Sequence, residues 1–130
     1  MSRTILIAGL ALALSAGALS AGAAPAQSGM TLDTFVTQAN RVPMNPTAAF
    51  RSDARRLMRE TNAGFTTVRN EIGADRAAGR TPVACPPERI ELNPRQLLTF
   101  LNAIPQPRRA RMSVSDGLRA WMADRYPCPR

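Results

Sequence analysis

Apolar side chains recur at helical spacing along most of the chain beyond residue 30. The longest stripe holds eight residues that share an arc of about 100° at 100° per residue. They are Phe50, Ala54, Leu57, Met58, Thr61, Phe65, Val68 and Ile72. Asn45-Pro46 predicts the start of this helix, with Asn as N-cap and Pro at the first helical position, and Gly79 predicts its end. Gly64 lies within the stripe and costs about 1 kcal/mol relative to Ala, which allows a kink there.

Three shorter helices are predicted from the same periodicity. The first covers Thr31 to Asn40, with Thr31 as N-cap. A second begins at Asn93-Pro94, with Gln96 at the capping-box position, and its apolar face is wide enough, at roughly 160°, to predict the most buried helix of the fold. The last opens at the capping box Ser113 to Asp116. Its inward residues are Val114, Leu118, Trp121 and Met122.

No segment predicts a convincing strand, and residues 81–92 form a Pro-rich connection that neither helix nor central strand accommodates. The last two helices are short and joined by the turn 105–112, which predicts an antiparallel hairpin. At 130 residues and 45% hydrophobic content, one domain is expected. The predicted fold class is all-α, a small single-domain bundle of four or five helices with a C-terminal helical hairpin closed by one disulfide.

Residues 1–26 have the organisation of a secretory signal peptide. Arg3 supplies the positive n-region, an apolar run covers residues 5–19, and Ala21-Gly22-Ala23 and Ala24-Pro25-Ala26 fit the A-x-A cleavage pattern. An uncleaved membrane anchor is the alternative, which the shortness of the run and its Ala, Gly and Ser content disfavour. Cleavage after Ala26 leaves residues 27–130 as the helical domain, and we expect it in the periplasm with no transmembrane segment.

Cys85 and Cys128 are the only cysteines, and in an exported chain they are expected to pair. One precedes the first helix of the predicted hairpin and the other follows the second helix, so both lie at the same end. A reactive thiol pair is the alternative, but it requires a C-x-x-C motif or a basic niche, and the sequence contains neither.

The amino-acid composition excludes several kinds of catalytic and metal site. The chain has no His, which excludes His-based triads and His metal ligation, and two Cys cannot make a closed four-ligand zinc site. We therefore expect no cofactor and no metal. Glu88 and Glu91 are the only carboxylates suggestive of a hydrolase pair, but nothing in the sequence fixes their separation or raises either pKa. We do not expect an enzyme.

All 17 basic residues are Arg, and the net charge is +8, or +7 once Arg3 is removed. Such a surface can bind anionic polymers, acidic peptides or nucleic acid. The arginines are spread over several helices without interleaved aromatic side chains, so solvated helix faces explain them better and no nucleic-acid partner is expected. Trp121 and Tyr126 are likewise expected in the core and at the hairpin end.

The C-terminal half resembles the type VI secretion amidase-immunity family (Tai-type and Rap-type). The shared features are Cys85-Pro86-Pro87, a helix with Gln96-Leu97-Leu98, the turn at Ile104-Pro105 and the ending Tyr126-Pro127-Cys128, so the resemblance covers residues 84–128. Members commonly carry a second cysteine pair ahead of the Gly-aromatic segment of the first long helix, whereas here Gly64-Phe65 remains and no cysteine accompanies it. The resemblance implies a periplasmic all-α protein that binds and blocks a peptidoglycan amidase delivered by a rival cell.

The leading hypothesis is therefore an exported binding protein that neutralises an amidase by occluding it. A periplasmic stress or chaperone-like helical protein and a basic envelope protein that holds anionic surface polymers are the alternatives, and a homodimer stays open. Loops on a rigid scaffold usually carry recognition. The candidate partner-binding residues are Arg108, Arg109 and Arg111 in the turn and Glu88 in the Pro-rich loop.

Overall fold

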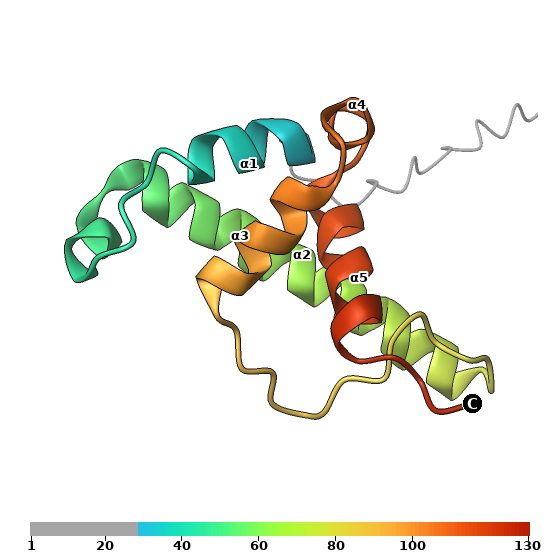
Figure 1. Ribbon diagram of the computed structural model, residues 1–130. Coiled ribbons are helices and arrows are strands. Elements are labelled where there is room, and N and C mark those ends of the chain that lie inside the picture. Colours follow the sequence, from blue (N-terminus) through green and yellow to red (C-terminus); the bar gives the residue numbers. More distant parts are fainter. Residues whose placement is uncertain (1–28) are drawn as a thin grey trace, which may run out of the picture.

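The computed structural model describes residues 29–130, and the predicted signal peptide lies outside them (Figure 1). The elements, in order, are α1 (Leu32–Ala39), the 3-10 helix η1 (Pro46–Phe50), α2 (Ser52–Ala77), α3 (Pro94–Ala103), α4 (Gln106–Arg109) and α5 (Val114–Arg125). The described residues contain no strand, only an isolated antiparallel bridge between Thr31 and Ser113. The all-α prediction is confirmed. No helix within residues 29–130 combines the length and the apolarity needed to span a bilayer.

The long helix begins later than the sequence predicts. Asn45 caps η1, not α2, by accepting a hydrogen bond from the Ala48 N–H at 3.2 Å. The backbone is extended at Arg51 (ψ 138°), and α2 starts anew at Ser52. Asp53 stabilises this second start, because its carboxylate accepts hydrogen bonds from the Ala54 N–H and from the Arg51 guanidinium. The break turns Phe50 out of the predicted stripe, and its side chain is 83% exposed.

α2 then continues as one 26-residue helix through Gly64, without a break at that glycine. Gly64 is buried against α5, and a Cβ there would lie 2.6 Å from Leu118 Cδ1. Gly117 on α5 is equally confined, since its Cβ would lie 2.7 Å from Leu32 Cδ1. The two glycines therefore allow close helix packing, which offsets their low helix propensity.

The predicted end of α2 is confirmed. Gly79 adopts a left-handed backbone (φ 71°), which a glycine reaches without steric cost. The Gly79 N–H bonds to the Arg76 carbonyl and the Arg80 N–H to the Asp75 carbonyl, at 3.1 and 2.8 Å. This pair of bonds is the Schellman arrangement that satisfies the last carbonyls of a helix.

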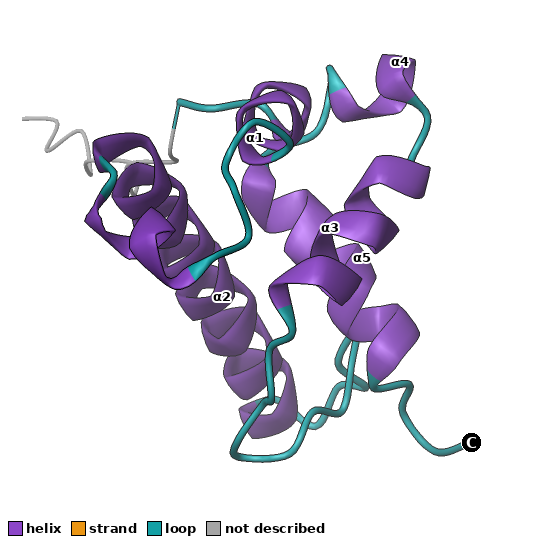
Figure 2. Cartoon of the chain, turned by 60° about the vertical axis from the view of Figure 1, so that its left-hand side comes forward, coloured by secondary structure: helices purple, strands orange, loops and turns teal. Residues whose placement is uncertain are grey.

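The centre of the core is α5, and the prediction that the helix beginning at Asn93 is the most buried was wrong. α5 packs mainly on α2 and also contacts α1 and α3, and four of its apolar residues are buried. In Figure 2, α2 lies to one side of α3 and α5. On α3 only Leu97 and Leu101 are buried, whereas Leu98, Phe100 and Ile104 are half-buried. α3 has helices on one side, and the rest of its wide apolar face remains partly open to solvent.

The C-terminal hairpin is present, with the short helix α4 within its turn. α3 and α5 run in opposite senses on either side of α4 (Figure 1). Cys85 and Cys128 form the predicted disulfide, with their Cα atoms 4.8 Å apart. The Cys85 N–H also donates to the Tyr126 carbonyl at 2.8 Å, so the loop 78–93 is fixed to the end of α5 by two links.

Candidate functional site

A large apolar groove opens on the side of α3 that α5 leaves uncovered. It is bounded by the end of α1, by η1 and the first half of α2, and by residues 91–98. Its volume is about 1150 Å³. The buried side chains at its floor come from three helices and belong to the core. They are Phe35, Ala54, Leu57, Leu97 and Leu101.

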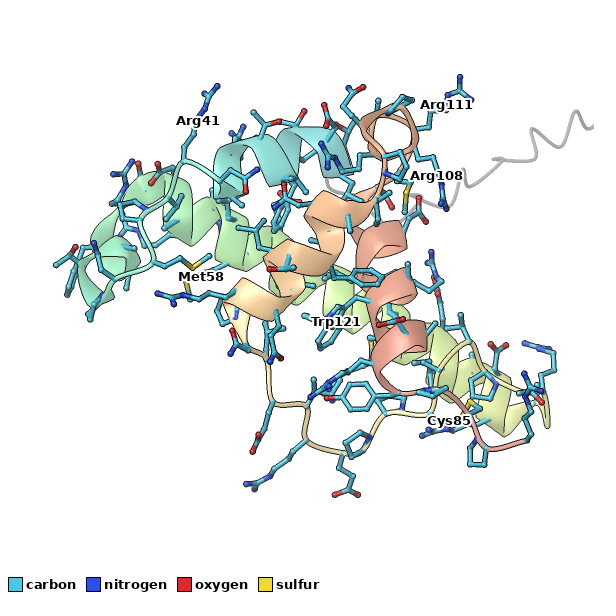
Figure 3. The ribbon with its side chains drawn as sticks, viewed as in Figure 1. Arg41, Met58, Cys85, Arg108, Arg111 and Trp121 are labelled. Atoms are coloured by element: carbon cyan, nitrogen blue, oxygen red, sulfur yellow. A yellow bond between two sulfur atoms is a disulfide. The ribbon has the colours of Figure 1, made fainter. Side chains whose placement is uncertain are left out.

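The walls of the groove hold large apolar side chains that no other part of residues 29–130 covers. Met44 is 45% exposed, Met58 56% and Leu92 39%, and all three line the groove. Met58 projects from α2 toward the beginning of α3 (Figure 3). Contiguous exposed apolar surface of this kind marks interaction sites, and thioether side chains adapt to irregular partners. This groove is the candidate functional site.

The rim of the groove is mainly basic. Arg95 and Arg125 line it from α3 and α5, and Glu91 is the one acidic lining residue among those described. Neither of these two arginines belongs to an ion pair within residues 29–130. We call them the rim arginines.

Arg51, at the start of α2, differs from the rim arginines because it is already paired. It donates to Asp53 at 2.7 Å, and this hydrogen bond lowers the pKa of Asp53 to about 2, while the pKa of Arg51 is raised by the same bond. Asp53 therefore stays ionised throughout the physiological pH range, and Arg51 is not available to a ligand in the way that the rim arginines are.

The predicted basic turn is divided by the structure. Arg108 and Arg111 are exposed and point away from the hairpin (Figure 3), as the sequence suggests. Arg109 does not belong with them, because its side chain is only 14% exposed. It donates to Asp33 on α1 at 3.2 Å and to the carbonyls of Asn102 and Ile104 at 3.1 Å. Arg109 thus holds the end of α3 against α1.

This geometry gives a prediction that separates the two neighbouring arginines. Arg109→Ala should lower the free energy of unfolding by about 1.5–3 kcal/mol, because it leaves two carbonyls and a half-buried carboxylate without their charged donor. Arg108→Ala should change it by about 0.5 kcal/mol or less, since the residue is exposed and unpaired in the described structure. Urea denaturation of both variants measures the difference. Equal midpoints would show that Arg109 has no structural role.

Glu88 lies apart from the turn. It is exposed in the loop 78–93, and its backbone carbonyl accepts a 3.4 Å hydrogen bond from Arg69 on α2. This loop and α4 are at opposite ends of the hairpin (Figure 1), so the four sequence-predicted site residues do not form one site. Of the two carboxylates considered for hydrolysis, Glu91 lines the groove, whereas Glu88 is not among its lining residues.

A second polar cluster joins α2 to α5. Arg119 donates two hydrogen bonds to Glu71, at 2.7 and 2.8 Å, and one to Asp116 at 2.7 Å. The bond to Glu71 raises the pKa of Arg119. Burial acts to raise the pKa of Asp116, but the hydrogen bonds from Ser113 and Arg119 outweigh it, and the pKa is lowered. Every charge in this cluster is partnered, so it stabilises the helix pair rather than offering a binding site.

Trp121 lies in the core, as predicted, and is 4% exposed. It packs edge-to-face against Phe65 of α2 and Tyr126 at the end of α5, with ring centroids 5.8 and 6.0 Å apart. Tyr126 is half-buried beside the disulfide-linked segment. The three rings therefore close the lower end of the hairpin onto α2, which agrees with the packing role inferred from the sequence.

Within residues 29–130, no three carboxylate or cysteine side chains gather as a metal-binding group. Comparison with protein-family models, with characterised proteins and with solved structures finds no match for this chain. The groove is the feature that sequence reasoning missed. The sequence did contain an indication of it. Met58 lies at the edge of the apolar stripe of the long helix, and a residue at such an edge faces solvent unless another element covers it.

Proposed function

We propose that this protein is an exported binding protein that neutralises a protein partner by covering it. The observation that carries the proposal is the apolar groove with exposed Met44, Met58 and Leu92 on a helical scaffold. Occlusion needs a complementary surface held in place, and it requires no catalytic group on the inhibitor. The disulfide and the Arg119 cluster hold α2, α5 and the loop 78–93 together and so support this role.

The proposed partner class is a peptidoglycan amidase, and the proposed compartment is the periplasm. The first follows from the resemblance of residues 84–128 to amidase-immunity proteins. The second follows from the predicted signal peptide, and the Cys85–Cys128 disulfide is compatible with an oxidising compartment. In this proposal the protein protects its own cell by binding an incoming amidase before the enzyme reaches the cell wall.

The test is protection of cells from a periplasmic amidase encoded beside the gene for this protein. Co-expression of the full chain should prevent lysis, and the purified mature chain should abolish cleavage of cell-wall peptides at equimolar ratio. The matched control is the same chain without residues 1–26, which should accumulate in the cytoplasm and fail to protect. Mass analysis of the protective form should show a start at or near Gln27. Continued lysis in the presence of abundant, oxidised and folded protein contradicts the proposal.

A further inference from the structure

We infer that the groove binds an amphipathic helical segment of the partner protein whose apolar face is flanked by acidic side chains. This inference deepens the proposed function. It rests on that function in one respect, which is that the ligand of the groove is a protein. The inference concerns the groove between η1, α2 and α3, not the exposed arginines of the turn 105–112.

The size of the groove favours a protein segment. Small molecules bind in pockets that enclose most of their surface, whereas this groove of about 1150 Å³ opens broadly to solvent. Its exposed apolar residues come from three separate segments, with Met44 before η1, Met58 on α2 and Leu92 before α3. A helix that lies across them would place side chains at i, i+3, i+4 and i+7 against such contacts.

Charge identifies the kind of segment. The two rim arginines, Arg95 and Arg125, are unpaired within residues 29–130, and Glu91 is the one acidic residue that lines the groove with them. Glutamate or aspartate on the flanks of an incoming helix would pair with these guanidinium groups at the edge of the apolar contact. In a dimer formed through the groove, the rim arginines of two copies would face each other, and each mature chain carries a net charge of +7, so like charge disfavours self-association there.

The groove can adapt to its occupant. Its two most exposed large apolar side chains belong to Met44 and Met58. Methionine side chains are unbranched and repack around differently shaped apolar groups. α3 presents Leu98, half-buried, to the same space. Together these features fit a helix with several medium-sized apolar side chains better than a single deep anchor.

Designed peptides test the inference directly on the mature chain. The probe is an 18-residue helical peptide with Leu at i, i+3, i+4 and i+7 and Glu on both flanks, labelled for fluorescence anisotropy. Two controls keep the same leucines. One has Lys in place of Glu, and the other has the Glu flanks but a central Pro that breaks the helix. The acidic helix should bind at least tenfold more tightly than either control, and its affinity should fall as salt rises.

Two pairs of variants locate the binding site. Arg95→Glu on the rim should lower the affinity for the acidic peptide about tenfold. Arg108→Glu makes the same charge change in α4, beyond the C-terminal end of α3, and should have little effect. Met58→Glu should weaken it by a similar factor, and Val83→Glu, at an exposed apolar residue that does not line the groove, should not. Thermal unfolding of each variant confirms that it is folded.

The inference is overturned if the Lys peptide binds as tightly as the Glu peptide, if Arg108→Glu weakens binding as much as Arg95→Glu, or if the mature chain forms a dimer that Met58→Glu disrupts. Failure of the proposed function has a different signature. In that case no host amidase is inhibited while the acidic peptide still binds at the groove. Conversely, an amidase inhibited equally by the wild type and by Met58→Glu would leave the proposed function standing and contradict the groove as its site.

Discussion

Replacement of both Cys85 and Cys128 by serine is expected to lower the free energy of unfolding by about 4 kcal/mol. The disulfide joins residues that are 43 positions apart in sequence. It thereby lowers the conformational entropy of the unfolded chain, and for a loop of this length that effect corresponds to about 4 kcal/mol. The bond is one of two links between the loop 78–93 and the end of α5, so its removal leaves the loop that leads into α3 and the groove less firmly held. For a domain of this size, the melting temperature should fall by roughly 15–30 °C.

The measurement compares oxidised wild type, reduced wild type and the double serine variant by thermal unfolding. Reduced wild type and the variant should melt together, and a reductant should leave the variant unchanged. A variant that melts with the oxidised wild type would show that the loop is held by its other contacts, such as the Cys85 N–H bond to Tyr126. Non-reducing mass analysis of periplasmic material should show the two cysteines joined.

Helix positions and caps were largely predictable because they depend on local chemistry. Thr31, Asn93 and Ser113 each cap the helix that the sequence assigned to them, and Ser113 and Asp116 form the complete capping box. Gly79 ends α2 for the same reason, since only a left-handed residue completes its last turn. The disulfide was predicted because an exported chain with two cysteines is expected to pair them, and the hairpin topology supports the pairing since it brings both to the same end.

What could not be predicted is which part of each apolar face is covered. The periodicity placed Phe50, Met58 and Val68 on one stripe, yet the structure exposes the first two and buries the third completely. Val68 belongs to the buried core cluster, whereas the helix is interrupted at Arg51 and no element within residues 29–130 covers Met58. Coverage depends on the tertiary arrangement of helices, and the period of one helix carries no information about its neighbours.

The same limit explains the division of the basic turn. The turn contains three arginines, Arg108, Arg109 and Arg111, and the local sequence does not distinguish them. Arg109 forms an ion pair with Asp33 because α1 packs beside the turn. Asp33 is 76 residues away in sequence, so no local pattern reports the pair. A charged residue in a turn is commonly solvated, but one that reaches the carbonyls at a helix end becomes part of the scaffold.

Two Leu→Ala substitutions separate the scaffold from the proposed binding surface, and the larger effect is expected at Leu118. Its side chain projects from α5 and is completely buried. It packs so closely against Gly64 of α2 that a Cβ at Gly64 would lie 2.6 Å from Leu118 Cδ1. Leu118→Ala should lower the free energy of unfolding by about 2–5 kcal/mol, because the close helix packing cannot collapse fully around the missing atoms. Urea denaturation should show a lower midpoint with an unchanged slope.

Leu92→Ala is the matched substitution at the groove, where the side chain is 39% exposed before the start of α3. It should cost about 1 kcal/mol or less in stability. Its effect should appear in binding, since the removed atoms form part of the wall against which the acidic helical peptide is expected to pack. Leu118→Ala, at a temperature where it remains folded, should bind that peptide with near wild-type affinity. Equal loss of peptide affinity in both variants would mean that the groove is sensitive to the whole core, and that Leu92 does not contact the ligand.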